Sequence, residues 1–146
     1  MISAYYDTNY LFKLQCQEHG STEIQAHART VDRLYCSLHG KAEFISAAHR
    51  KIREKTATAA DLSLLLAQLH NDTAAGGLRW IAIGEPIINR VESIYRSAPA
   101  HTYLRAADAI HLASAAENGF REIFSNDKHL LAAAPLFGLQ GVNLIP

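Results

Sequence analysis

The sequence opens with the stretch that indicates the fold, ISAYYDTNYLFKL at residues 2–14. Its first half is a short apolar segment that ends on Asp7, which predicts a strand over residues 2–7. Tyr10, Leu11 and Leu14 then fall at helical spacing, and Thr8 or Asn9 can cap the helix that this spacing predicts. A strand that passes directly into a helix is the repeating unit of an α/β fold.

The same alternation of strands and helices continues along the chain. Residues 35–38, 78–83, 122–125 and 142–145 are predicted strands, and residues 78–83 have the pattern of a central one. Further helices are expected over residues 21–34, 41–54, 58–76, 85–95, 103–117 and 127–134. This order predicts an α/β protein, a three-layer α/β/α sandwich with a short parallel sheet. No linker or repeat interrupts it, so we expect one domain over residues 1–146.

Composition limits the classes of partner. The 146 residues are 49% hydrophobic and 19% charged, which is typical of a globular chain. Lysine plus arginine and aspartate plus glutamate both total 14, so the formal net charge is zero. A protein that binds nucleic acid through overall charge carries a basic excess. Any nucleic acid must therefore be held by a local basic patch, a bound cation or a partner chain.

The sequence also bears on the compartment. Its N-terminal residues lack the charged and apolar regions of a signal peptide, and no apolar run reaches the roughly 18 residues of a membrane span. Only Cys16 and Cys36 are present, too few for a secreted disulfide framework. We expect a cytoplasmic protein with two reduced thiols and no membrane partner.

Two acids follow predicted strands. Asp7 and Asp127 each come just after a strand, where the carboxyl ends of parallel strands line a ligand crevice. The simpler alternative is that each one only caps the helix that follows it.

A third acid lies in an apolar helix. Asp108 belongs to residues 103–113, which carry little polar surface, and a buried carboxylate is costly unless it is paired or binds a metal. The alternative is a structural ion pair between Arg105 and Asp108, with His111 as a hydrogen-bonded neighbour on the same face.

Taken together, the acids indicate a metal site. Glu43, early in the helix at residues 41–54, is unremarkable alone, but with Asp7, Asp108 and Asp127 it completes a set of four carboxylates. Oxygen ligands favour Mg²⁺ or Mn²⁺ over zinc. The sequence has no HExxH zinc motif, no glycine-rich phosphate loop and no G-x-S-x-G elbow.

Four stretches carry a resemblance to a known family. They are YYDTN at residues 5–9, Ser37 with Ala42-Glu43, LRAADAIHLA at residues 104–113 and FSNDKHL at residues 124–130. The chain resembles the PIN-domain ribonucleases over nearly its whole length, and among them the VapC-type toxins of bacterial toxin–antitoxin pairs. It departs from them at Ser125, where threonine is common, and at Asn126, which leaves Asp127 as the only acid of that turn.

The resemblance implies a function and a site. It implies that Asp7, Glu43, Asp108 and Asp127 bind Mg²⁺, with Mn²⁺ as a substitute, and that the protein cleaves RNA phosphodiester bonds as an endoribonuclease. Thr8, Asn9 and Ser125 would orient the carboxylates, and Arg105 would contact a substrate phosphate or balance Asp108. It also implies a homodimer and a small antitoxin partner. Cations such as Lys13 and the basic residues 50–55 would add RNA affinity, although such a run is more often a solvated helix face.

Two other functions fit parts of the pattern. A non-catalytic PIN-like module would bind metal or RNA without turnover, but a degenerate copy tends to lose at least one of the four acids. A metal-dependent phosphatase with an aspartate nucleophile would need a second acid two residues after Asp7, where the chain has Asn9.

Overall fold

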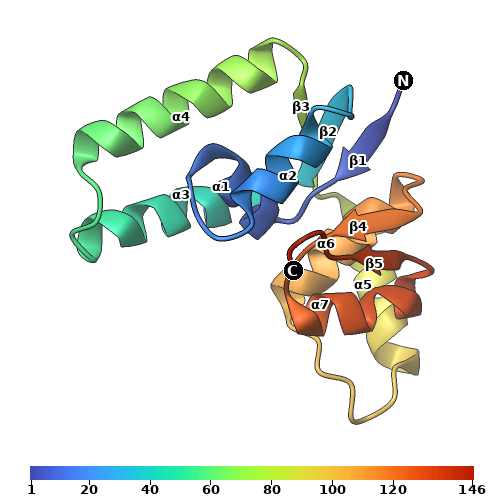
Figure 1. Cartoon of the computed structure of the whole chain (residues 1–146). Coiled ribbons are helices and arrows are strands. Elements are labelled where there is room, and N and C mark those ends of the chain that lie inside the picture. Colours follow the sequence, from blue (N-terminus) through green and yellow to red (C-terminus); the bar gives the residue numbers. More distant parts are fainter.

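Short parallel strands form the middle layer of the computed structural model, which describes residues 1–146 (Figure 1). Strands β1 (Ser3–Tyr5), β2 (Arg33–Ser37) and β3 (Leu78–Ile81) pair in that order, and β4 (Glu122–Phe124) pairs with β5 (Gln140–Val142). The two parts meet where Tyr6 bridges Phe124 and the Asp7 N–H donates to the Phe124 carbonyl at 3.1 Å. β1 therefore lies between β2 and β4, and every pairing is parallel, as the sequence predicts.

Helices cover both faces of this layer. They are α1 (Thr8–Gln15), α2 (Ser21–Ala28), α3 (Leu38–Arg53), α4 (Ala59–Ala74), α5 (Glu85–Ser97), α6 (Ala106–Glu117) and α7 (Lys128–Ala133), and a 3₁₀ turn follows at Ala134–Phe137. Successive side chains of a strand point to opposite faces of its sheet. Accordingly, Tyr6 packs in one hydrophobic core with residues of α1 to α4, and Tyr5 packs in a second core with residues of α5 to α7. These two cores confirm the three-layer sandwich.

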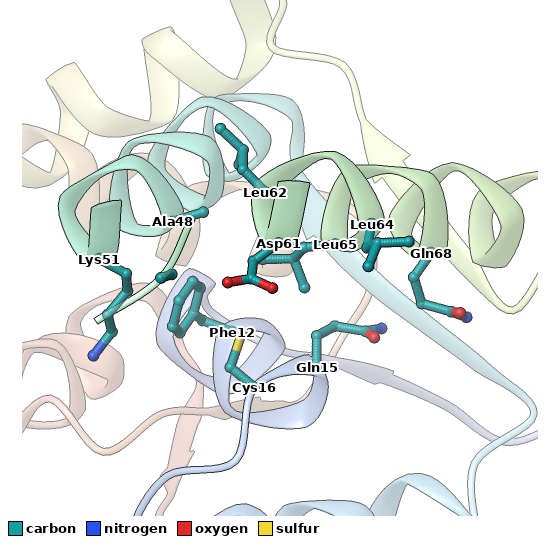
Figure 2. Close-up of a pocket in the computed structure, with 11 residues that line it drawn as sticks. Phe12, Gln15, Cys16, Ala48, Lys51, Asp61, Leu62, Leu64, Leu65 and Gln68 are labelled. Carbon is teal, nitrogen blue, oxygen red and sulfur yellow. The ribbon is translucent and has the colours of Figure 1, made fainter. Parts of the chain in front are cut away.

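Helices α3 and α4 project from the body as an antiparallel pair (Figure 1). Thr58 and Asp61 form the predicted capping box at the start of α4. A groove of about 350 Å³ lies between this pair and α1, with Phe12, Ala48 and Leu65 on its walls (Figure 2). We call it the apolar groove. At its margin Leu64 is 71% exposed, so α4 carries apolar surface that the chain itself leaves uncovered.

Several predicted boundaries are wrong. The helix expected over residues 21–34 ends at Ala28, because Leu34 pairs with β1 and β3 as part of β2. The strand expected to be central is β3, which pairs only with β2 and is an edge strand. The last strand lies at Gln140–Val142 instead of residues 142–145. In each case the pairing between strands, which local pattern does not contain, decides the boundary.

Helix starts also differ from the prediction. Asp7, and neither Thr8 nor Asn9, caps α1, since its carboxylate accepts from the Tyr10 N–H. Helix α3 begins directly after β2 at Leu38, and α6 begins at Ala106, with Arg105 in extended conformation at its N-cap. No helix of the chain combines the length and the apolar character that crossing a bilayer requires.

Candidate active site

All four predicted acids line one cleft, which we call the acid cleft. Its volume is about 540 Å³, and it lies where β1, β2 and β4 end. Asp7 follows β1, Asp127 follows β4, Glu43 comes from α3 directly after β2, and Asp108 comes from the first turn of α6. The carboxyl ends of parallel strands meet at one edge of a sheet, which is why residues far apart in the chain converge here. The other lining residues are Thr8, Asn9, Ala42, Ser46, Ala47, Arg50, Arg53, Arg105 and His111.

Asp7 both caps a helix and faces the cleft. Its Oδ1 accepts from the Tyr10 N–H at 2.9 Å, and its Oδ2 accepts from the Ser125 hydroxyl at 2.5 Å. Burial raises the pKa of Asp7 to about 6, although His111 and the Ser125 hydrogen bond act in the opposite direction. Asp7 therefore caps α1 and also lines the acid cleft. Its Oδ1 makes the capping contact, and its Oδ2 binds the Ser125 hydroxyl.

Asp127 divides its oxygens in the same way. Its Oδ1 accepts from the N–H groups of His129 at 2.9 Å and Leu130 at 3.2 Å, which caps α7. Its own N–H donates to the Ser125 Oγ at 2.9 Å, so Ser125 connects Asp127 with Asp7. Both contacts use only the hydroxyl of Ser125, so serine can make them at a position where threonine is common.

Arg105 joins two of the acids. Its Nε lies 3.1 Å from Asp108 Oδ2, and its Nη2 lies 2.9 Å from Asp127 Oδ2. The ion pair considered from the sequence is thus present, and it extends to a second carboxylate. Because the Arg105 side chain is 56% exposed while Asp108 is buried, the guanidinium covers the carboxylates from the solvent side.

Glu43 is held by hydrogen-bond donors. Its Oε1 lies 2.9 Å from His111 Nε2, 2.9 Å from the Thr8 hydroxyl and 3.2 Å from His39 Nε2. Burial would raise the pKa of Glu43, but the hydrogen bonds from His111 and His39 outweigh it and lower this pKa well below its usual range. Glu43 is therefore ionised and fixed in orientation.

A buried set of hydrogen bonds, which we call the relay, connects His111 with Tyr5 and Ser37. The Ser37 N–H donates to the Tyr5 hydroxyl at 3.0 Å, and this hydroxyl lies 2.7 Å from His111 Nδ1. Ionised Glu43 can only accept, so the nitrogen that faces it, His111 Nε2, carries a proton; in a neutral His111, Nδ1 then accepts from the Tyr5 hydroxyl. From the sequence, His111 is expected only as a neighbour of Asp108, and Tyr5 and His39 are not expected in the site. The i,i+4 spacing of His39 and Glu43 is the sequence pattern that would have indicated their contact.

The histidines do not by themselves make a metal site. Ligand atoms of His39, Glu43 and His111 lie within 4.8 Å of one another, close enough for one ion. In this structure, however, His111 Nε2 faces Glu43 Oε1 at 2.9 Å and His39 Nε2 faces it at 3.2 Å, which makes both nitrogens hydrogen-bond donors to Glu43. The histidines are better described as donors that position Glu43.

Gly40 permits this arrangement. A Cβ at this position would lie 2.5 Å from Cys36 Sγ and 3.1 Å from both His111 Cε1 and Thr8 Oγ1. The absence of a side chain at Gly40 therefore lets α3 lie close to His111 and Thr8.

The donor set of the acid cleft suits a hard divalent cation, because it includes carboxylate oxygens from four acids. The ligand atoms that lie within 4.8 Å of one another are those of His39, Glu43 and His111, so Glu43 is the acid common to both sets. Oxygen donors of this kind suit Mg²⁺ or Mn²⁺.

Comparisons with known proteins agree with this geometry. The family model described as PIN domain matches residues 4–135. No curated protein sequence matches the chain. Among solved structures, a toxin–antitoxin complex from Klebsiella pneumoniae is similar with a TM-score of 0.64 and 20% identity, over 97% of both chains. VapBC2 from Rickettsia felis, bound to a DNA fragment from its promoter, has a TM-score of 0.67 and 11% identity, over 97% of this chain and 98% of that one. FitAcB from Neisseria gonorrhoeae has a TM-score of 0.66 and 16% identity, over 97% of both chains.

Proposed function

Because the chain belongs to the PIN domain family, we propose that it is a Mg²⁺-dependent endoribonuclease that acts as the toxin of a toxin–antitoxin pair. One observation supports this most directly: Asp7, Glu43, Asp108 and Asp127, from four separate elements, line the same cleft. Asp108 is only 8% exposed there, and its Oδ2 is paired with Arg105 at 3.1 Å.

The four carboxylates would hold the cation, and the surrounding residues would hold the carboxylates. When bound, Mg²⁺ or Mn²⁺ lowers the pKa of water and neutralises charge on the scissile phosphate. Ser125 and the Tyr10 N–H fix the two oxygens of Asp7, while His111 and Thr8 fix Oε1 of Glu43. Hydrogen bonds that orient the ligands of a metal in this way tune its affinity and the activity. Arg105, which contacts Asp108 and Asp127, would share these carboxylates with the cation, and its exposed guanidinium would be available to a substrate phosphate.

The proposed partner is a small antitoxin. The similar structure from Klebsiella pneumoniae is a toxin–antitoxin complex, and the apolar groove with exposed Leu64 gives this chain a surface for an apolar segment of such a partner (Figure 2). A homodimer and a cytoplasmic location remain predictions. Sedimentation of the purified chain, alone and with the antitoxin, measures both assemblies.

The deciding experiment is cleavage of total cellular RNA by the purified chain with Mg²⁺, with EDTA and after Asp7→Asn. We expect discrete products that require Mg²⁺ and disappear in the variant. Mg²⁺ binding by folded protein without any cleavage would instead support the non-catalytic module. Release of phosphate from a small phosphate monoester, with RNA left intact, would support the phosphatase.

A further inference from the structure

Two arginines of α3 line the acid cleft. Arg50 and Arg53 lie on the same cleft wall as Glu43. Arg50 approaches an acid only at Glu54, at 3.9 Å, and its side chain is 57% exposed. No ion pair of the molecule includes Arg53. Arg53 thus has no ion-pair partner and Arg50 has only this long contact, so both guanidinium groups keep donors for a ligand in the cleft.

The helical register places these arginines in line with the acids. Seven residues, almost two turns, separate Glu43 from Arg50, so they share a face of α3, and Arg53 follows about one turn later. Ser46 and Ala47 are the cleft residues between Glu43 and Arg50, and both are small. Because these side chains are short, an extended ligand has room to lie along α3 between Glu43 and Arg50.

The other basic residues of this region point elsewhere. Lys51 contacts Glu18 at 3.1 Å and lines the apolar groove on the other side of α3 (Figure 2). Lys13 contacts the same Glu18 at 3.3 Å. The basic residues 50–55, which the sequence pattern describes as one solvated helix face, are thus divided in the structure. Arg50 and Arg53 line the acid cleft, and Lys51 lines the apolar groove.

We propose that Arg50 and Arg53 bind phosphates of the RNA strand on one side of the cleavage position, an inference that rests on the proposed nuclease function. At a rise of about 1.5 Å per residue, they lie about 10 Å and 15 Å along α3 from Glu43. A stacked strand rises about 3.4 Å per nucleotide, so the contacts fall about three and about four nucleotides from the cleaved bond. Guanidinium groups bind phosphate oxygens in a bidentate manner. A chain with zero net charge thereby gains a local cationic strip beside its acids.

The salt dependence of binding tests this strip. A fluorescent 12-nucleotide single-stranded RNA is titrated with Asp7→Asn protein in Mg²⁺ at increasing salt, so that the RNA stays intact. Each phosphate contact in a single strand contributes about 0.7 to the slope of log Kd against log salt. We expect Arg50→Gln with Arg53→Gln to lower this slope by about 1.4, and lysine at both positions to preserve it. Arg96→Gln is the matched control, because Arg96 is 77% exposed and contacts only Glu92.

Cleavage by otherwise unmodified protein separates this inference from the nuclease proposal. With Arg50→Gln and Arg53→Gln together we expect KM to rise about tenfold at unchanged kcat. When the RNA is shortened from one end, the KM values of the wild-type chain and the double variant should become equal, and shortening from the other end should leave them different. Cleavage by the wild-type chain with an unchanged slope and KM in the double variant would overturn the arginine strip and leave the nuclease intact. Failure of the wild-type chain to cleave any RNA would overturn the nuclease, whatever the slope.

Discussion

The Ser125 hydroxyl lies 2.5 Å from Oδ2 of Asp7, although 118 residues separate the two along the chain. The same oxygen of Ser125 accepts the N–H of Asp127. One hydroxyl thus fixes two acids that follow different strands, β1 and β4, across the only bridge between the two parts of the sheet.

Removal of this hydroxyl should weaken cation binding most at low pH. Ser125→Ala takes a hydrogen bond from ionised Asp7, so the pKa of Asp7 should rise beyond about 6. Calorimetric titration at pH 6 and pH 8 should show Mg²⁺ affinity falling about tenfold at pH 6 and less at pH 8. Ser125→Thr, which keeps the hydroxyl, is the control. Equal losses at both pH values would mean that Ser125 acts on geometry alone.

Asp7→Asn should abolish cleavage and stabilise the metal-free protein at pH 8. The folded pKa of Asp7, about 6, exceeds its ordinary value of 3.8, because burial disfavours the charged form. The stability that this group contributes is therefore present below pH 3.8 and is lost as the pH rises through 6. Urea unfolding in EDTA should show the variant about 1–3 kcal/mol more stable at pH 8. That advantage should narrow by about 1.4 kcal/mol at pH 5. A difference independent of pH would contradict the raised pKa.

Arg105→Gln should tighten Mg²⁺ binding. The Arg105 guanidinium contacts Oδ2 of both Asp108 and Asp127, so a cation that uses these oxygens competes with it. We expect several-fold higher Mg²⁺ affinity by calorimetry, with a lower melting temperature in EDTA because the two carboxylates lose their positive partner. Arg90→Gln, which breaks the Arg90–Glu117 pair outside the cleft, should leave the affinity unchanged. Weaker binding in Arg105→Gln would show that Arg105 orients the acids instead of competing for them.

Tyr5→Phe should slow cleavage, although Tyr5 makes no hydrogen bond to any of the four acids. It leaves the Ser37 N–H without its acceptor, at a cost of about 1–3 kcal/mol, and removes the donor that keeps the His111 proton on Nε2. Loss of a residue that orients a metal ligand costs about 10- to 100-fold, and we expect a fall in kcat within this range at unchanged KM. Tyr103→Phe, at a 57% exposed side chain, is the control. Nitrogen chemical shifts of His111 should report the change of tautomer. An unchanged tautomer together with unchanged kcat would refute the relay.

Gly40→Ala should destabilise the fold although alanine favours a helix by about 1 kcal/mol. The added methyl would lie 2.5 Å from Cys36 Sγ and 3.1 Å from His111, inside a packed region. Overpacking of this kind costs about 1–3 kcal/mol, measurable by urea unfolding. Gly77→Ala, whose methyl meets no atom closer than 3.9 Å, should change stability far less. Similar values for the two variants would indicate that α3 moves aside freely.

The sequence predicts the layers better than the contacts within the site. Alternating strands and helices suffice for a parallel sandwich, and an acid after a strand suffices to place Asp7 and Asp127 at one edge, because both are local patterns. The contact of Arg105 with Asp127 depends on where α6 lies relative to β4, and no local pattern encodes that. The same holds for the separation of Arg50 from Lys51: the helical period puts them on different faces, but only packing decides which face becomes the cleft.

The bridge between β1 and β4 also has a consequence during synthesis. A ribosome that adds about 5–20 residues per second needs about 6–24 s to go from Asp7 to Ser125. Until then the nascent chain has no complete acid cleft. The last residue of the apolar groove, Gln68, is added 61 residues after Asp7, about halfway through that interval, and 59 residues before Asp127. A partner that recognises this groove therefore meets its binding surface well before the last acid of the cleft exists.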